Sequence, residues 1–100
     1  MQGDVTALHI TAFFGLNNIV STLLFKGANA NSRDSFGTTP LIYAASKGHM
    51  DVTDTLLYAG ASASNVCGRG STALHRALEQ RHTKVVRRLL KEKDMAVNAL

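Results

Sequence analysis

The chain has 100 residues, of which 45% are hydrophobic and 18% charged, a balance typical of one globular domain. Its apolar runs are too short and too interrupted to span a membrane. The formal net charge of +4 is uneven: residues 66–100 carry eight basic and three acidic side chains, and residues 1–65 carry three and four. A basic end can attract nucleic acid or an acidic surface, but it is more often a solvated helix face.

The cysteine content and the N-terminal residues indicate the cellular compartment in which the protein is expected. Cys67 is the only cysteine, so no internal disulfide can form. No basic segment followed by an apolar stretch comes after Met1, so no signal peptide is visible. A free thiol in a Gly-rich turn suits an oxidising compartment poorly, and we therefore expect an intracellular location.

The first predicted unit contains two short helices. Thr6 precedes the first helix, Gly15 ends it, and Gly27 ends the second. A threonine at a helix start can accept a hydrogen bond from an unpaired backbone N–H, and a glycine after the helix can adopt a left-handed conformation. The predicted plan is helix, tight turn, helix, and then a loop rich in Gly, Asn and Ser.

The second unit repeats this plan in its most regular form. Thr39 and Pro40 mark a helix start, because proline at the first helical position lacks an N–H that would otherwise go unpaired. Gly48 ends this helix and Gly60 ends the next one. Ala45 is small, so we expect it to be buried where the helices of adjacent units pack closely.

The third unit keeps Thr72 but loses both helix-ending glycines, with Arg81 and Lys93 in their places. A non-glycine residue in the left-handed region costs about 1 kcal/mol. We therefore expect the third unit to be the least stable of the three.

The three units recur at a spacing of 33 residues, with Thr6, Thr39 and Thr72 each standing two places before a leucine. A fixed period of this size indicates a stack of similar supersecondary units rather than one globular core. Such a stack usually offers a binding surface rather than a reaction centre.

The repeated segments resemble the ankyrin-repeat signature T-P-L-H-x-A. They read Thr6-Ala-Leu-His-Ile-Thr, Thr39-Pro-Leu-Ile-Tyr-Ala and Thr72-Ala-Leu-His-Arg-Ala. The resemblance implies a mainly α fold, an ankyrin-repeat solenoid of helix-turn-helix units joined by β-hairpin-like loops. We expect one domain over residues 1–100, with repeats near 1–33, 34–66 and 67–100, as a fragment of a longer array.

The four histidines of the chain are candidate metal ligands or general bases. His9 and His75 share one repeat position, and His49 and His82 share another. The resemblance implies that they hold loops and helix ends together through hydrogen bonds. No zinc-ligand spacing, nucleophile elbow or phosphate-binding loop is readable, and Cys67 has no evident base beside it. We therefore expect no enzyme activity, no metal and no cofactor.

A positive stripe follows the last predicted helix, at Arg81, Lys84, Arg87, Arg88 and Lys91. Phosphate contacts require such a stripe, but stacking on bases requires aromatic residues beside it, and none follows Tyr58. The pattern favours a solvated face over nucleic-acid binding.

The resemblance also implies where a protein partner binds, at the hairpin tips and the inner face of each first helix. The tips include Ser35, Phe36, Thr38 and Arg69, together with Gln2 and Gly3, and the helix positions are Phe13, Phe14, Ser46, Lys47, Glu79 and Gln80. Exposed phenylalanines commonly anchor interfaces, although partial burial against a neighbouring helix fits equally well. The expected function is a non-enzymatic protein-interaction module with no membrane contact. A structural spacer or autoinhibitory segment of a larger protein is the alternative.

Overall fold

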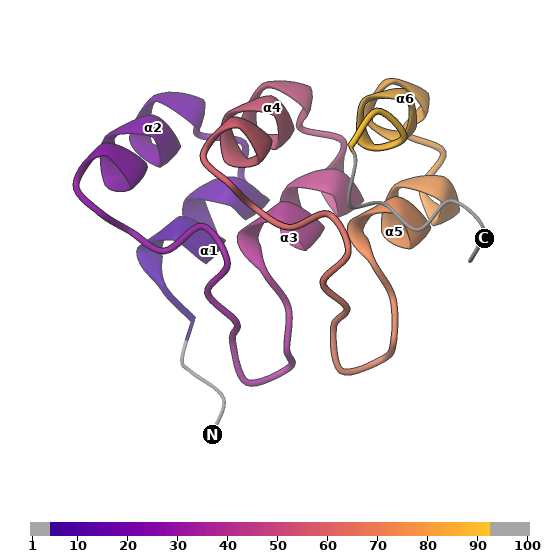
Figure 1. Cartoon of the computed structure of the whole chain (residues 1–100), viewed down its shortest axis with the longest axis horizontal. Coiled ribbons are helices and arrows are strands. Elements are labelled where there is room, and N and C mark those ends of the chain that lie inside the picture. The colour runs from indigo at the N-terminus through magenta and orange to yellow at the C-terminus, as the bar shows by residue number, and fades with distance from the viewer. Residues whose placement is uncertain (1–4, 93–100) are drawn as a thin grey trace.

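The computed structural model describes residues 5–92. This part of the chain forms three successive helix-turn-helix pairs and no strand (Figure 1). The pairs are α1 (Ala7–Phe13) with α2 (Asn17–Phe25), α3 (Pro40–Lys47) with α4 (Met50–Tyr58), and α5 (Ala73–Glu79) with α6 (Thr83–Leu89). The predicted mainly α solenoid is confirmed.

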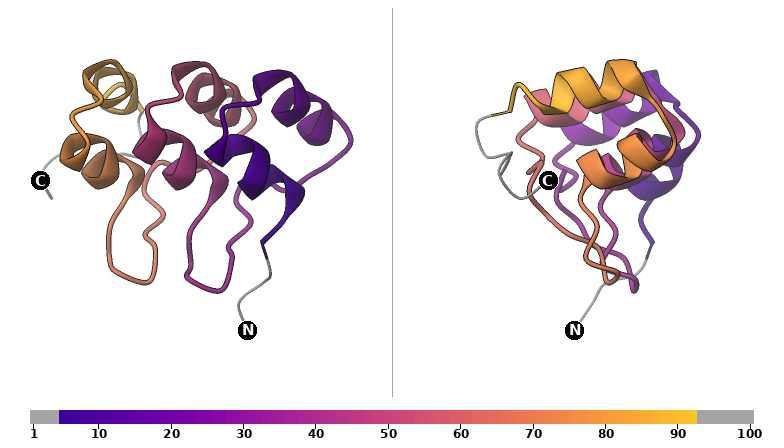
Figure 2. Two further views of the ribbon diagram at one scale, coloured as in Figure 1. Left: turned by 180° about the vertical axis from the view of Figure 1, so that it is seen from behind. Right: turned by 90° about the vertical axis from the view of Figure 1, so that its right-hand side faces the viewer.

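The helices form two rows. Figure 1 shows α2, α4 and α6 in one row and α1, α3 and α5 in a second, with the loops projecting from the second row away from the first. The views from behind and from the side in Figure 2 show the same arrangement. We call α1, α3 and α5 the inner helices, since they lie between the outer helices and the loops.

Each inner helix begins after the predicted threonine. The hydroxyls of Thr6, Thr39 and Thr72 accept a hydrogen bond from the backbone N–H three residues later. In α1 and α5 the ring of His9 or His75 also accepts from the backbone N–H of the threonine, which completes a capping box. Pro40 instead occupies the first position of α3, as predicted.

Left-handed residues follow the inner helices. Gly15 and Gly48 have φ angles of 73° and 74°, and Arg81 adopts φ 60° at the same place in the third unit. Among residues 5–92, Arg81 is the one non-glycine residue with a positive φ. The strained position expected in the third unit is therefore present, whereas Lys93 lies outside the described residues.

The core lies between the two helix rows. Its large members include Leu8, Leu41, Leu74, Val20, Leu56 and Leu89. Ala45 is fully buried, as predicted, and Ala12, Ala44 and Ala77 are buried with it. These small side chains let the inner helices approach one another more closely than the outer helices do. The stack therefore curves toward the side of the inner helices and loops.

Histidines join successive units. The Nε2–H of His49 donates to the Phe13 carbonyl at 2.9 Å, and that of His82 donates to the Ser46 carbonyl at 3.0 Å. His9 reaches the carbonyls of Ser32 and Thr38 at 3.0 and 2.9 Å. These bonds satisfy carbonyls that the helix ends and loops would otherwise leave unpaired. The histidines therefore have the structural role that the resemblance implied.

Candidate partner-binding surface

The loops of the second and third units form one continuous edge. The backbone N–H of Gly68 donates to the Phe36 carbonyl at 2.7 Å, which ties the two tips together. Each loop is also closed internally: Asp34 N–H donates to the Thr38 carbonyl at 3.1 Å, and Cys67 N–H donates to the Ser71 carbonyl at 2.9 Å. The tips are thus hairpin-like turns held by backbone hydrogen bonds.

Asp34 organises the second loop from its base. Its buried carboxylate accepts from the backbone N–H groups of Phe36 and Thr38, each at 2.9 Å, and from the Tyr43 hydroxyl at 2.5 Å. Burial by itself raises the pKa of Asp34, but these three hydrogen bonds and the nearby His9 bring it below its usual value. Burial and the Asp34 carboxylate together raise the pKa of Tyr43 to about 12. The pair therefore carries one negative charge at neutral pH, and it fixes Tyr43 on the inner face.

A cavity of about 640 Å³ lies between these tips and the inner helices α3 and α5, and we call it the main groove. Its predicted residues are Ser35, Phe36, Thr38, Ser46 and Arg69, and its other lining residues are Ile42, Tyr43, Cys67, Gly68 and Arg76. This volume is in the range of ligand-binding clefts. The structure therefore brings five of the predicted partner-binding residues together around one groove.

A smaller cavity of about 220 Å³ lies beside α1. Phe13 and Phe14 line it together with Val5, His9, Ile10 and Tyr43. Tyr43 lines both cavities, so the main groove and the smaller cavity are adjacent on one face.

The phenylalanines on this face differ in exposure. Phe36 is 72% exposed and Phe14 is 62% exposed, as predicted. Phe13 is only partly exposed, because its ring packs edge-on against Phe14 and Tyr43, at centroid distances of 5.0 and 5.9 Å. The Lys47 Nζ lies 4.7 Å from the centre of the Phe13 ring, a cation–π distance. Of Phe13, Phe14 and Phe36, Phe13 is therefore the one that is partly buried, whereas the other two are exposed.

A family model for ankyrin repeats in three copies matches residues 8–99. The chain belongs to the ankyrin-repeat family. Over 44 residues it is 46% identical to an ankyrin and IPT/TIG repeat-containing protein of Schizosaccharomyces pombe, and equally to Rabankyrin-5 of Homo sapiens. Each match covers 44% of this chain and 4% of the relative. Ankyrin repeats are in general protein-interaction modules rather than enzymes.

Three predicted residues, Lys47, Glu79 and Gln80, line neither cavity of this ankyrin stack. Glu79 places its carboxylate 3.6 Å from the Arg76 Nε, and Gln80 is exposed after α5. Lys47 lines neither cavity but reaches the smaller one through its contact with Phe13. The inner-helix ends therefore form the rim of this surface rather than its floor.

The prediction did not include Ile42, Tyr43, Cys67 and Arg76 in the main groove or His9 and Ile10 in the smaller cavity. Of these, Tyr43, Arg76 and Ile10 share one repeat position, three residues before Ser46, Glu79 and Phe13 respectively. Residues three apart lie on the same helix face, so this spacing could have identified them.

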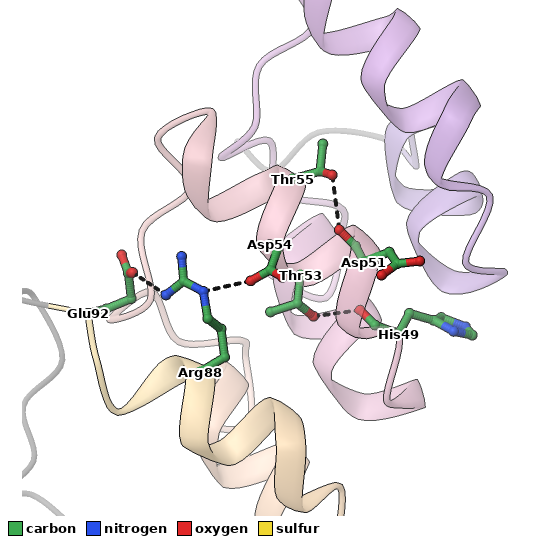
Figure 3. Close-up of polar contacts among 7 residues, drawn as sticks. All are labelled: His49, Asp51, Thr53, Asp54, Thr55, Arg88 and Glu92. Atoms are coloured by element: carbon green, nitrogen blue, oxygen red, sulfur yellow. Dashed lines mark hydrogen bonds and ion pairs between the residues drawn. The ribbon is translucent and has the colours of Figure 1, made fainter.

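The basic stripe of the third ankyrin repeat is partly neutralised within the protein. Arg88 points from α6 toward α4, where its Nε lies 2.6 Å from the Asp54 carboxylate and its Nη1 lies 2.7 Å from the Glu92 carboxylate (Figure 3). The Glu92 bond and, to a smaller degree, the Asp54 bond raise the pKa of Arg88. The other predicted members, Arg81, Lys84, Arg87 and Lys91, are exposed.

Two threonine hydroxyls of α4 donate to backbone carbonyls four residues earlier in the chain. Thr53 donates to the His49 carbonyl at 2.8 Å, and Thr55 donates to the Asp51 carbonyl at 2.9 Å (Figure 3).

Within residues 5–92, no group of three or more His, Cys, Asp or Glu side chains could hold a metal ion. The same range has no helix with the length and apolar character that crossing a bilayer requires.

Proposed function

We propose that this ankyrin-repeat domain binds a protein partner through its hairpin tips and inner helices, at the main groove and the smaller cavity. The exposure of Phe36 and Phe14 beside these two cavities carries the proposal. Large exposed aromatic side chains around a concave surface are typical of interface anchors. The backbone bond between the two tips supports it further, since a rigid edge loses little conformational freedom on binding.

We further propose that residues 1–100 form one domain that belongs to a longer ankyrin array. Ile19 of α2 is 48% exposed, whereas its counterparts Val52 and Val85, in the two units that each have a unit before them, are buried. Leu16 is also exposed. In a solenoid each repeat contacts its neighbours, so a preceding repeat is expected to cover Ile19.

Selection from a displayed library of random peptides, with the domain immobilised, tests the binding proposal. Selected peptides are then titrated against Phe36→Ala and Phe14→Ala. Loss of an aromatic anchor costs about 2 kcal/mol, which corresponds to roughly thirtyfold weaker binding. Phe25→Ala is the matched control, because Phe25 is 92% exposed but lies at the end of the outer helix α2. It should bind like the unmodified domain.

Melting curves for the three variants complete the test. If Phe36→Ala unfolds the domain, Phe36 is a structural residue and the proposal loses its main support. If no selected peptide depends on Phe36 or Phe14, the alternative of a structural spacer or autoinhibitory segment is favoured.

A further inference from the structure

The third repeat lacks the anionic partner that the second repeat has at the base of its loop. Arg76 occupies the repeat position of Tyr43, and Cys67 occupies that of Asp34. In the second repeat the Tyr43 hydroxyl bonds to the Asp34 carboxylate. In the third repeat Arg76 therefore has a cysteine where a carboxylate stands in the second repeat, and its ion pair is with Glu79 on the same helix, at 3.6 Å.

The groove arginines are poorly satisfied within the protein. The Arg76 Nε is buried and has no hydrogen-bond partner, since the Glu79 carboxylate lies 3.6 Å away, beyond hydrogen-bond distance. Arg69 is exposed and forms no ion pair within residues 5–92. Arg88 on the outer row, by contrast, has two carboxylates within 2.7 Å. Arg69 and Arg76 therefore both have donor capacity left at the main groove.

The composition of the groove is complementary to a negative charge beside an apolar group. Arg69 and Arg76 supply the positive charge, and no acidic side chain lines the cavity. Phe36, Ile42 and Tyr43 supply apolar surface in the same cavity. Arginine binds a carboxylate through two parallel hydrogen bonds, and a partly enclosed site strengthens them.

We propose that the main groove binds a peptide segment in which an aspartate or glutamate lies next to an apolar residue. The carboxylate contacts Arg76 and Arg69, and the apolar side chain packs on Phe36. This inference rests on the proposed function, and it adds the chemical class of the partner.

The probe is a peptide selected on the immobilised domain from the displayed random library. The best binder is synthesised with acetylated and amidated ends, so that only its side chains carry carboxylates. We expect an acidic residue beside an apolar one in the selected sequences. Changing that residue to its amide should weaken binding at least about tenfold, as should Arg76→Gln or Arg69→Gln in the domain. Arg87→Gln on the exposed outer helix is the matched control for general charge effects, and it should change the affinity little.

A double-mutant cycle decides whether the contact is direct. Once Arg76→Gln is present, the amide change in the peptide should cause little further loss, because the two groups then no longer interact. If Arg76→Gln lowers the melting temperature, the same double-mutant cycle is measured with Arg69→Gln, because Arg69 lies on the exposed tip. Selected peptides that are neutral or basic, and that depend on Phe36 but on neither arginine, would overturn this inference while leaving the proposed function intact. If no peptide depends on Phe36, Phe14 or the arginines, both proposals fail.

Discussion

At Gly15 and Gly48 the backbone and the next repeat both favour glycine. Their positive φ values disfavour a side chain, and the histidine of the following repeat occupies the space that a side chain would need. A Cβ on Gly48 would lie 2.5 Å from the His82 Nδ1, and one on Gly15 would lie 2.7 Å from the His49 Nδ1. The histidine just before the outer helix of one repeat thus restricts the residue that ends the inner helix of the repeat before.

This arrangement predicts different costs for two glycine substitutions. Gly60→Ala should cost about 1 kcal/mol, since Gly60 has φ 96° but no atom within 4 Å of a new Cβ. Gly48→Ala should cost about 1–3 kcal/mol more, because His82 must also move. Urea unfolding of both variants measures the difference. Equal losses of unfolding free energy at the two positions would mean that His82 moves aside without strain.

Among the elements, α6 has the weakest support. It packs against α5 and, more loosely, against α4, whereas α4 has an outer helix on each side. Arg81 adds a strained backbone at the turn into α6. In a stack of repeats, stability is a sum of each unit's own folding and its contacts with its neighbours. Within residues 5–92, we therefore expect the third unit to be the least stable of the three.

We therefore expect amide hydrogen exchange to be faster over residues 85–90 than over residues 52–57 under native conditions. Arg81→Gly removes the left-handed strain and should slow exchange in residues 85–90, with less effect on residues 52–57. Mass spectrometry of peptic fragments measures both segments in one sample. Slower exchange in the third unit than in the second would contradict this ranking of the repeats.

At the scale of the whole molecule, the basic stripe of α6 and the grooves lie on different sides. The exposed cations of α6 belong to the outer row, whereas the grooves lie at the inner helices and loops. Tyr58 of α4 is exposed and lines a shallow pocket with Arg88, and no aromatic residue follows it in the sequence. The stripe can therefore attract a polyanion from a distance, but it offers little aromatic surface for stacking on bases.

Nucleic-acid binding should therefore be weak, independent of sequence, and lost at about 150 mM salt. Lys84→Glu combined with Arg87→Glu should remove the residual low-salt binding without disturbing the ion pairs of Arg88. Fluorescence anisotropy with a labelled DNA duplex and a labelled single-stranded RNA, across a salt series, provides the measurement. Submicromolar affinity at about 150 mM salt that the double variant abolishes would instead favour nucleic acid as the partner.

The periodic sequence determined the fold because each repeat encodes its own local structure. The Thr39 cap, Pro40 and the Gly48 stop depend on near neighbours in the chain, and a spacing of 33 residues shows that the pattern recurs. The burial of Ala45 followed from the same register. Residues at the hairpin tips, such as Phe36, were also placed by register, and they line the main groove.

The tertiary structure decided how residues of different repeats combine. Local sequence does not show that Phe13 is half-buried by Tyr43 and Lys47, or that Arg88 is neutralised by a carboxylate of α4. Nor does it show that Arg76 and Phe36 line the same groove, since 40 positions separate them in the chain. Their loops are brought together by the backbone hydrogen bond from Gly68 to Phe36. Helix starts and stops depend on adjacent residues, whereas a binding surface depends on distances across the stack, which only the packed repeats define.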